Sequence, residues 1–284
     1  MMIPDHYERQ AMLEIQHWKN PRAGGSLRAF KVINKPLDSL GNAILQAPGI
    51  GGILQGVIIA LTGICNDLAQ LSVRPQAIFE EFRRDGWSGV ASLGDIGALS
   101  LAGIDKTVGS LSAKYKGLAL AEGMGAGLTG IAGLALDIPS LITLNLRAVG
   151  EYATYYGFDI NKQEEKLFAL QIMGLVSSPS DAAKNIAMAQ LAAITRDTAK
   201  KRTWRQLEKH ALVKIIQEIA KTLGIRLTKA KLAQTVPIVG AVVGGGYNVY
   251  FTTQVCDAAY YLYRERFLSM RFGPQVTAVA VRPA

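Results

Sequence analysis

The sequence predicts an all-α protein folded as a single compact bundle of about ten helices. Helix-capping patterns recur along the chain, whereas runs that alternate apolar and polar residues, as strands do, are scarce. In addition, 29 glycines gather with alanines in long uncharged blocks, a composition typical of closely packed core helices. We expect one helical domain over residues 1–284, with the helices of residues 1–40 packed on it and a carboxy-terminal tail over 272–284.

Four helices are expected from their amino-terminal capping patterns. In each, a side-chain oxygen can accept a hydrogen bond from the backbone of the first turn, and a residue three positions later can reach back to the cap. The helices should therefore begin near residues 6, 162, 179 and 204. The patterns are Asp5 with Glu8, Asn161 with Glu164, Ser178 with Asp181, and Thr203 with Gln206.

Three segments show the spacing of amphipathic helices. In residues 204–223 apolar side chains recur every three or four positions, and Gly224 is expected to end this helix. Residues 138–156 and 162–176 show the same spacing and are separated by a short turn at 156–159. We expect these last two helices to pack as an antiparallel pair.

The uncharged blocks predict close contact between helix backbones. Glycine lowers the stability of an isolated helix, so its frequency here needs a compensating contact, which a flat small-residue face provides. Residues 47–52, in contrast, are expected to form a loop. The small-residue spacings are Gly52 with Gly56, Gly123 with Gly127, and Gly240 with Gly244.

Two uncharged blocks are borderline in length for a membrane span. Residues 50–66 number 17, and residues 238–256 number 19 but include several polar side chains. A span needs about 20 mostly apolar residues, so we expect peripheral contact with a membrane rather than integral insertion. The start of the sequence lacks a secretory signal pattern, and its two cysteines are far apart. Both observations favour a cytoplasmic location.

Polar residues within apolar surroundings have two interpretations. One is structural: Asp137 caps the helix that follows it, and Arg147 pairs with Glu151 one turn later. The other is that several of these side chains line a shared buried pocket between helices. The candidates for that pocket are Asp95, Asp137, Asn145, Arg147 and Asn248.

The positive charge of the chain is concentrated in one segment. Residues 196–231 hold eleven Lys or Arg against three acids, while the whole chain has a net charge of +9. Beside a tryptophan, such a segment suits an anionic lipid surface, although a solvated helix face is an equally ordinary explanation. No nucleic-acid partner is expected, since aromatic residues for stacking are not interleaved. The candidate binding residues are Lys200, Lys201, Arg202, Trp204, Arg205 and Lys209.

Patterns that carry catalysis or bind metals are missing from the sequence. The three histidines are not spaced as ligands of one metal, and no nucleophile elbow, phosphate loop or dinucleotide motif is present. We therefore expect no catalytic residues, no metal, no cofactor and no enzymatic activity. A hydrolase of unrecognised type stays as an alternative, and it requires several of Asp95, Glu122, Asp137 and Asp257 to converge in one cleft.

Several stretches of the chain resemble the EcsC family. The resemblance implies a bacterial helical protein associated with transport or the cell envelope, because the family is named for a protein encoded beside an ABC transporter. It implies no reaction and no catalytic residue, and the matching residues Gly157, Pro237, Gly240 and Asn248 look structural. The stretches are LNLRAVGEYA at 144–153, YGFD at 156–159, EEKL at 164–167, QTVPIVGAVVG at 234–244 with Asn248, and Tyr7-Glu8-Arg9 leading to Trp18.

These observations predict a non-enzymatic accessory protein at the cytoplasmic face of the membrane. The expected partner is an anionic membrane lipid or an acyl chain held between apolar helices, together with a transporter or another membrane protein. The main alternative is a soluble protein-interaction module in which the basic helix binds an acidic partner.

Overall fold

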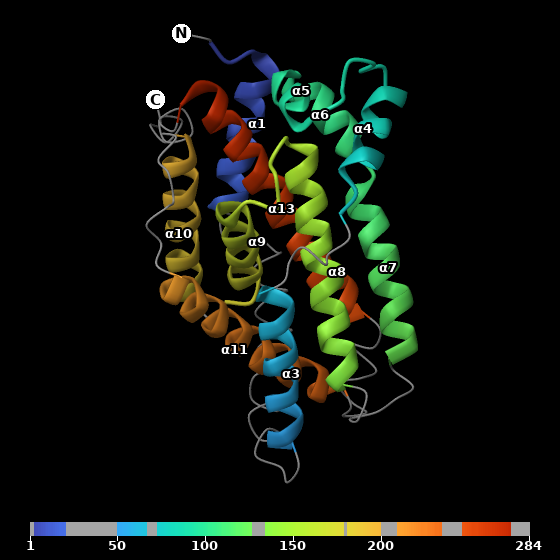
Figure 1. Cartoon of the computed structure of the whole chain (residues 1–284), viewed down its shortest axis with the longest axis vertical. Coiled ribbons are helices and arrows are strands. Elements are labelled where there is room, and N and C mark those ends of the chain that lie inside the picture. Colours follow the sequence, from blue (N-terminus) through green and yellow to red (C-terminus); the bar gives the residue numbers. More distant parts are fainter. Residues whose placement is uncertain are drawn as a thin grey trace.

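The computed structural model describes residues 3–20, 50–66, 73–126, 134–178, 181–199, 209–234 and 246–273. Within these ranges every regular element is a helix, which confirms the predicted all-α class (Figure 1). Eleven helices are present there, close to the number expected. They are α1 (His6–Lys19), α3 (Ile50–Asn66), α4 (Pro75–Arg84), α5 (Leu93–Ala98), α6 (Leu101–Val108), α7 (Leu111–Ala126), α8 (Leu134–Tyr155), α9 (Gln163–Val176), α10 (Asp181–Ala199), α11 (Lys209–Gln234) and α13 (Gly246–Phe272).

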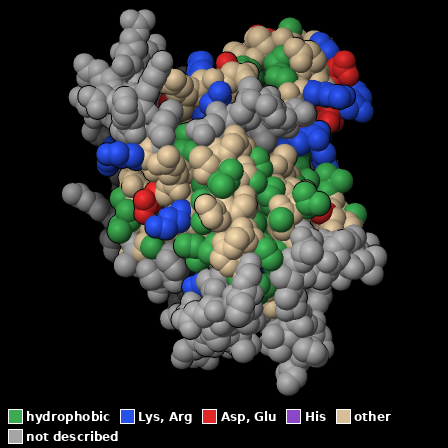
Figure 2. Space-filling view, turned by 60° about the horizontal axis from the view of Figure 1, so that its bottom comes forward, with side chains coloured by type: hydrophobic (Ala, Val, Ile, Leu, Met, Phe, Trp, Pro, Cys, Tyr) green, Lys and Arg blue, Asp and Glu red, His purple; other side chains and the backbone are tan. Residues whose placement is uncertain are grey.

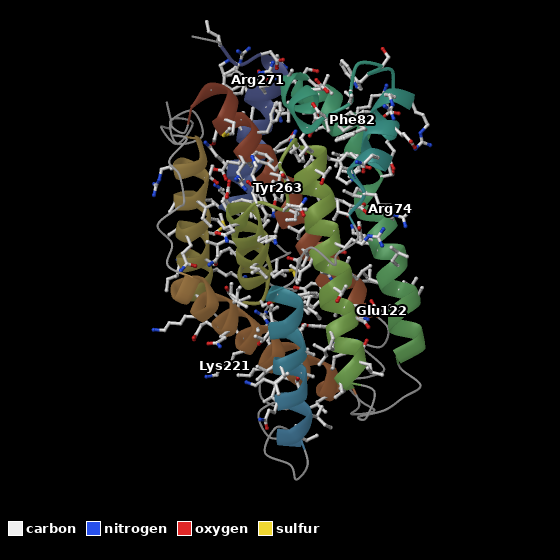
Figure 3. The ribbon with its side chains drawn as sticks, viewed as in Figure 1. Arg74, Phe82, Glu122, Lys221, Tyr263 and Arg271 are labelled. Carbon is white, nitrogen blue, oxygen red and sulfur yellow. The ribbon has the colours of Figure 1, made fainter. Side chains whose placement is uncertain are left out.

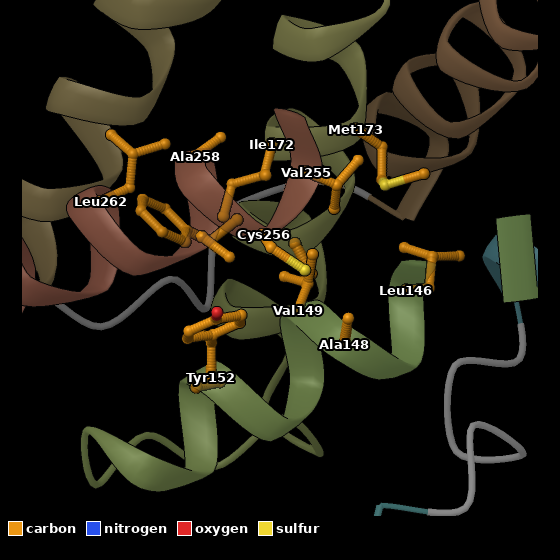
Figure 4. Packing of buried hydrophobic residues seen from close by; sticks show 14 of the residues in the cluster. Leu146, Ala148, Val149, Tyr152, Ile172, Met173, Val255, Cys256, Ala258 and Leu262 are labelled. Carbon is orange, nitrogen blue, oxygen red and sulfur yellow. The ribbon is translucent and has the colours of Figure 1, made fainter. Parts of the chain in front are cut away.

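The bundle is built around α8 and α13. Figure 4 shows Val149 and Tyr152 of α8 facing Val255 and Cys256 of α13, and all four side chains are buried. Helices α7 and α9 also pack on this central pair. The apolar side chains removed from water at these contacts supply the main stabilisation of the fold.

The first helix begins where its capping pattern predicts. Asp5 accepts a hydrogen bond from the backbone of Glu8, and the Glu8 carboxylate accepts one from the backbone of Asp5. The helix packs on α13, where Trp18 stacks on Tyr261 with ring centroids 5.2 Å apart. Within residues 6–19 the amino-terminal region therefore packs on the bundle as expected, whereas residues 21–49 lie outside the described ranges.

The predicted pair of helices is α8 and α9, which contact each other and are joined by a short connection. Gly157 in this connection has φ +81°, and a Cβ there would lie 2.9 Å from the carbonyl oxygen of Leu93. Glycine alone satisfies both conditions without strain. The predicted Asn161 cap is wrong, because Lys162 occupies the N-cap position and Asn161 instead donates to Asp159.

Two predicted boundaries are wrong. Helix α11 continues through Gly224 to Gln234, because Gly224 lies where α11 crosses α3. A Cβ on Gly224 would come within 2.9 Å of Ile58, so this glycine permits close approach of two helices rather than ending one. Similarly, Ile50–Gly52 are the first residues of α3 and not part of a loop.

The predicted glycine pairs have different outcomes. Gly52 and Gly56 face open space, so that spacing makes no close helix contact among the described residues. Gly123 does lie in a close contact, with Asn248 of α13. The partner Gly127 and the pair at 240 and 244 lie outside the described ranges, as do the helix starts predicted near 179 and 204.

Candidate functional site: the α3 end of the bundle

Four helix segments at one end of the bundle are almost free of charge, and the basic helix α11 packs on one of them, α3. They are α3 together with residues 117–126 of α7, 134–146 of α8 and 246–256 of α13, and we call this end the α3 end. Within these segments the formally charged side chains are Glu122 and Asp137. In Figure 1 this end lies at the bottom, opposite α4, α5 and α6.

Helix α3 has an inner face that is packed and an outer face that is not. Val57, Leu61 and Cys65 are buried against α8 and α11. The opposite side of α3 presents Ile59, whose side chain is 64% exposed, and a group of small or uncharged residues. The exposed residues of α3 are Gly51, Gly52, Gln55, Gly56, Ile59 and Gly63.

Neighbouring helices add large exposed apolar side chains to this end. Leu136 of α8 is 77% exposed, and Leu118 and Leu120 of α7 are each about half exposed. Figure 2 looks towards this end and shows hydrophobic side chains gathered on it, with Lys and Arg mostly towards its margins. Exposed apolar surface of this extent is typical of sites that contact another molecule or a membrane.

A buried ion pair lies behind this apolar surface. Lys231 of α11 and Asp137 of α8 are both buried, and the Lys231 Nζ lies 2.6 Å from an Asp137 Oδ. The structural interpretation of Asp137 as a helix cap is therefore wrong, because α8 already includes Leu134 and Asp137 lies within its first turn. Asp137 thus ties α8 to α11.

Glu122 of α7 lies close enough to this pair to interact with both charges. Burial raises the pKa of the Glu122 carboxyl, the negative charge of Asp137 raises it further, and Lys231 opposes both effects. Figure 3 shows Glu122 on α7 beside α8. Three helices therefore contribute ionisable groups to one cluster, in which Asp137 and Lys231 are buried and Glu122 is half-buried.

Two asparagines of the neighbouring helices are also buried. Asn248 of α13 is buried against the backbone of Gly123, and neither its side-chain oxygen nor its nitrogen has a hydrogen-bond partner among the described residues. Asn145 of α8 donates to the Leu141 carbonyl at 2.7 Å, while its own oxygen is without a partner there. Asn145, Asn248 and Asp137 are thus each buried, and a pocket shared by the three stays a prediction.

The other two residues predicted for that pocket do not enter it. Asp95 is exposed at the start of α5, where its carboxylate accepts hydrogen bonds from Ser92 and Ala91 and its pKa is lowered as a result. Arg147 is partly exposed and lies 3.5 Å from Glu151, as its structural interpretation predicts. Ser92 is the N-cap of α5, and Asp95 in its first turn reaches back to Ala91 and Ser92, so its carboxylate has local partners and needs no pocket.

The carboxylates required by the hydrolase alternative are not gathered in one place. Glu122 and Asp137 are neighbours, but Asp95 lies on α5 at the opposite end of the bundle. Asp257 of α13 interacts with Lys116 of α7 instead, and burial raises its pKa. The described residues therefore bring together two of the four.

The basic segment is described in part. Lys200, Lys201, Arg202, Trp204 and Arg205 lie outside the described residues, and Lys209 is the first residue of α11, with no description of its side chain.

Along the rest of α11 the basic side chains have different environments. Lys214 and Lys221 are exposed, and Figure 3 shows Lys221 on the outside of α11. Arg226 donates a hydrogen bond to the Ser178 carbonyl, and Lys231 forms an ion pair with Asp137. Arg226 and Lys231 of the basic segment therefore stabilise the fold, whereas Lys214 and Lys221 face solvent.

Sequence reasoning missed a buried network at the opposite end of the bundle. Arg264 of α13 is buried and donates to Asp105 of α6 at 2.8 Å and to Glu14 of α1 at 2.8 Å. Asp105 also accepts hydrogen bonds from the hydroxyls of Tyr7 and Tyr156, at 2.9 and 2.6 Å. Burial raises the pKa of Asp105, and the Arg264 charge opposes that effect.

A second buried arginine lies two residues further along α13. Arg266 donates to both carboxylate oxygens of Glu165 at 2.5 Å and stacks over the rings of Phe158 and Phe168. The alternating charges of residues 264–266 look like a solvated surface in the sequence. The tyrosines and phenylalanine around them are the signal that could have indicated burial, since aromatic faces accept guanidinium groups.

None of the described helices is both long enough and apolar enough to cross a bilayer. Among the same residues, no three His, Cys, Asp or Glu side chains are grouped so that they could hold a metal ion.

Comparisons with known proteins place this architecture in context. The sequence profile of the EcsC protein family matches residues 9–268. Protein EcsC of Bacillus subtilis (strain 168) is 28% identical over 63% of this chain and 70% of its own length. The uncharacterized protein YdbA of the same organism is 25% identical over 68% of this chain and 64% of its own length, slightly less than two thirds. No solved structure matches the chain significantly.

Proposed function

Since the chain belongs to the EcsC family, we propose that it is a non-enzymatic accessory protein that binds peripherally to the anionic cytoplasmic face of a membrane. The observation that carries this proposal is the exposed positive charge of α11. This helix has six basic residues against a single acid, Glu218. Two of its lysines, Lys214 and Lys221, are exposed and make no ion pair with any described carboxylate.

Electrostatic attraction gives this arrangement its binding energy. Each lysine or arginine near an anionic surface contributes about 1 kcal/mol, and the attraction declines within a Debye length. The preceding residues 200–205 add four basic side chains and Trp204 in the sequence. Tryptophan prefers the headgroup region of a bilayer, so this composition favours a lipid surface over an acidic protein. A role in transport or the cell envelope, and the binding of a single lipid or acyl chain, belong to the same proposal.

Sedimentation with vesicles tests the proposal directly. The protein should sediment with vesicles that contain phosphatidylglycerol, and its affinity should fall as the salt concentration rises. Neutral phosphatidylcholine vesicles should recover little protein. Equal recovery with both vesicle types, or none with anionic vesicles at low salt, would contradict the proposal.

Charge reversal locates the binding face. Lys214→Glu with Lys221→Glu should weaken binding by more than about 30-fold, since removing two lysines alone costs about 2 kcal/mol. A matched control is Arg83→Glu with Arg84→Glu, which changes the net charge equally on exposed residues of α4 at the opposite end. Equal weakening by both double variants would show that net charge, and not this face, governs binding.

A further inference from the structure

The outer face of α3 carries no charge that would attract a charged partner. Its 17 residues carry no formal charge, and its exposed side includes four glycines, Gln55 and Ile59. A helix surface exposed to water is ordinarily polar, whereas here the packed and exposed faces are both uncharged. A partner for this face must therefore be apolar over the area of the helix.

The packing of α3 fixes which of its sides is available. Gly224 of α11 lets α3 approach closely, and a Cβ at that position would touch Ile58 and Val57. Helices α8 and α11 thus cover one side of α3. On the other side, Gly51, Gly52 and Gly56 have no neighbouring atom within 4 Å of the Cβ position among the described residues.

A charged residue on the helix next to α3 indicates which kind of partner contacts the outer face of α3. Lys221 lies one helical turn before Gly224 on α11, the helix that packs on α3, and its side chain is exposed. Lysine side chains beside an apolar surface place their charge at the level of lipid phosphates while their methylene groups lie along acyl chains. An uncharged helix face with an exposed lysine on the neighbouring helix thus matches the boundary between headgroups and hydrocarbon.

The length of α3 sets how it can meet a bilayer. A helix of 17 residues is about 25 Å long, shorter than the roughly 30 Å hydrocarbon core, and one side of it is attached to the rest of the bundle. An interfacial helix instead lies with its apolar face about 5–10 Å into the headgroup and acyl boundary. Between its two ends the backbone groups of α3 are paired within the helix, so shallow insertion of its middle turns leaves no peptide group unsatisfied there.

We propose that the outer face of α3 inserts shallowly into the acyl-chain boundary of an anionic bilayer, with Lys221 at the level of the phosphates. This inference rests on the proposed function and adds an orientation: the α3 end faces the membrane, and α4, α5 and α6 point away from it. Electrostatic binding brings the protein to the surface, and α3 then provides the apolar contact.

A pair of matched isoleucines makes the test specific. Ile59 of α3 is 64% exposed, and Ile186 is 62% exposed on α10, a helix that lies on a flank of the bundle away from α3 (Figure 1). Each is changed to cysteine and labelled with an environment-sensitive fluorophore. The native Cys65 and Cys256 are buried, and burial raises the pKa of each thiol to about 12, so they react slowly at neutral pH.

On phosphatidylglycerol vesicles the label at position 59 should shift to the blue and be quenched by lipids with brominated acyl chains. The label at position 186 should report water throughout. In unlabelled protein, Ile59→Asp should weaken vesicle binding about tenfold or more, because a carboxylate must then enter the acyl boundary, whereas Ile186→Asp should leave binding unchanged.

The outcomes separate this inference from the proposed function. If the protein sediments with anionic vesicles while both labels report water, shallow insertion is wrong and electrostatic binding stands. If the protein does not sediment at all, the proposed function fails. A blue shift at position 59 without vesicles that grows with protein concentration would assign the α3 face to a second copy of this chain and overturn the inference.

Discussion

The ion pair between Asp137 and Lys231 joins two helices where neither side chain has much access to water. Burying two charges costs several kcal/mol, which their attraction offsets only while both partners are present. One oxygen of Asp137 also has no hydrogen-bond partner among the described residues. The pair thus specifies how α8 meets α11 more than it adds to stability.

Removal of one partner of this pair should be severe. Asp137→Ala should lower the free energy of unfolding by about 3–5 kcal/mol, because it leaves the Lys231 ammonium buried without its ion-pair partner. Urea denaturation followed by circular dichroism measures the change. The double variant Asp137→Leu with Lys231→Met should recover most of the loss. A double variant as unstable as the single one would contradict this view of the pair.

Glu122 should make stability depend on pH. Its folded pKa lies above the ordinary value of about 4.5, so the native state binds a proton more tightly than the unfolded chain. Stability should therefore rise as the pH falls through the folded pKa, with the gain complete below the unfolded value. Glu122→Gln should stabilise the protein at pH 7 and remove this part of the pH dependence.

The control for this prediction is the exposed carboxylate of Glu218 on α11. Glu218→Gln removes the same formal charge from an exposed position and therefore controls for the change in net charge. If Glu122→Gln has the same pH profile as wild type, burial of this carboxyl does not influence folding.

Sequence reasoning identified individual polar residues better than their partners. Asn145, Asn248 and Asp137 could be singled out because each interrupts an apolar stretch. Lys231 could not, since a lysine within a basic run looks solvated and its acidic partner lies 94 positions earlier in the chain, on another helix. Pairing over such distances depends on how helices cross, which local patterns do not contain.

Gly224 shows how a single small residue determines the crossing of two helices. Its lack of a side chain allows α3 to lie directly against α11, with Ile58 filling the space. In the sequence the same residue looks like the end of a helix, because glycine commonly follows the last turn. Tertiary packing outweighs that local preference, since the helix gains buried contacts on both sides of Gly224.

Two glycine substitutions should have opposite effects on stability. Gly224→Ala should cost about 1–3 kcal/mol, because the new methyl group would lie 2.9 Å from Ile58 and force the helices apart. Gly56→Ala, in the exposed face of α3, should stabilise by about 0.5–1 kcal/mol, because alanine favours the helix and meets no neighbour. Thermal or urea denaturation compares the two. A destabilising Gly56→Ala would mean that this face is already covered.

Helix boundaries could be predicted where the signal is local. The capping box at Asp5 and the glycine turn at Gly157 each depend on residues within one turn, and both are confirmed. The predictions for Gly52 with Gly56 failed because a flat face permits a close contact without specifying its partner. Which small-residue face is covered depends on the whole arrangement of the bundle.

At the scale of the whole molecule, the two ends of the bundle differ in where their charged side chains lie. At the end away from α3, buried arginines of α13 bind Asp105 and Glu165 and fasten α1, α6 and α9 to the central helix. In the segments of the α3 end the exposed side chains are uncharged, Asp137 is buried and Glu122 is half-buried. The two ends therefore differ in charge, and we propose that the uncharged one faces the membrane.

Hydrogen–deuterium exchange with and without phosphatidylglycerol vesicles tests this orientation most directly. The account predicts slower exchange in peptides from α3 and the adjoining parts of α7, α8 and α11, and unchanged exchange in α4, α5 and α10. Neutral vesicles should change nothing. Slower exchange in α4 or α10 while α3 stays unaffected would contradict the claim that the α3 end faces the membrane.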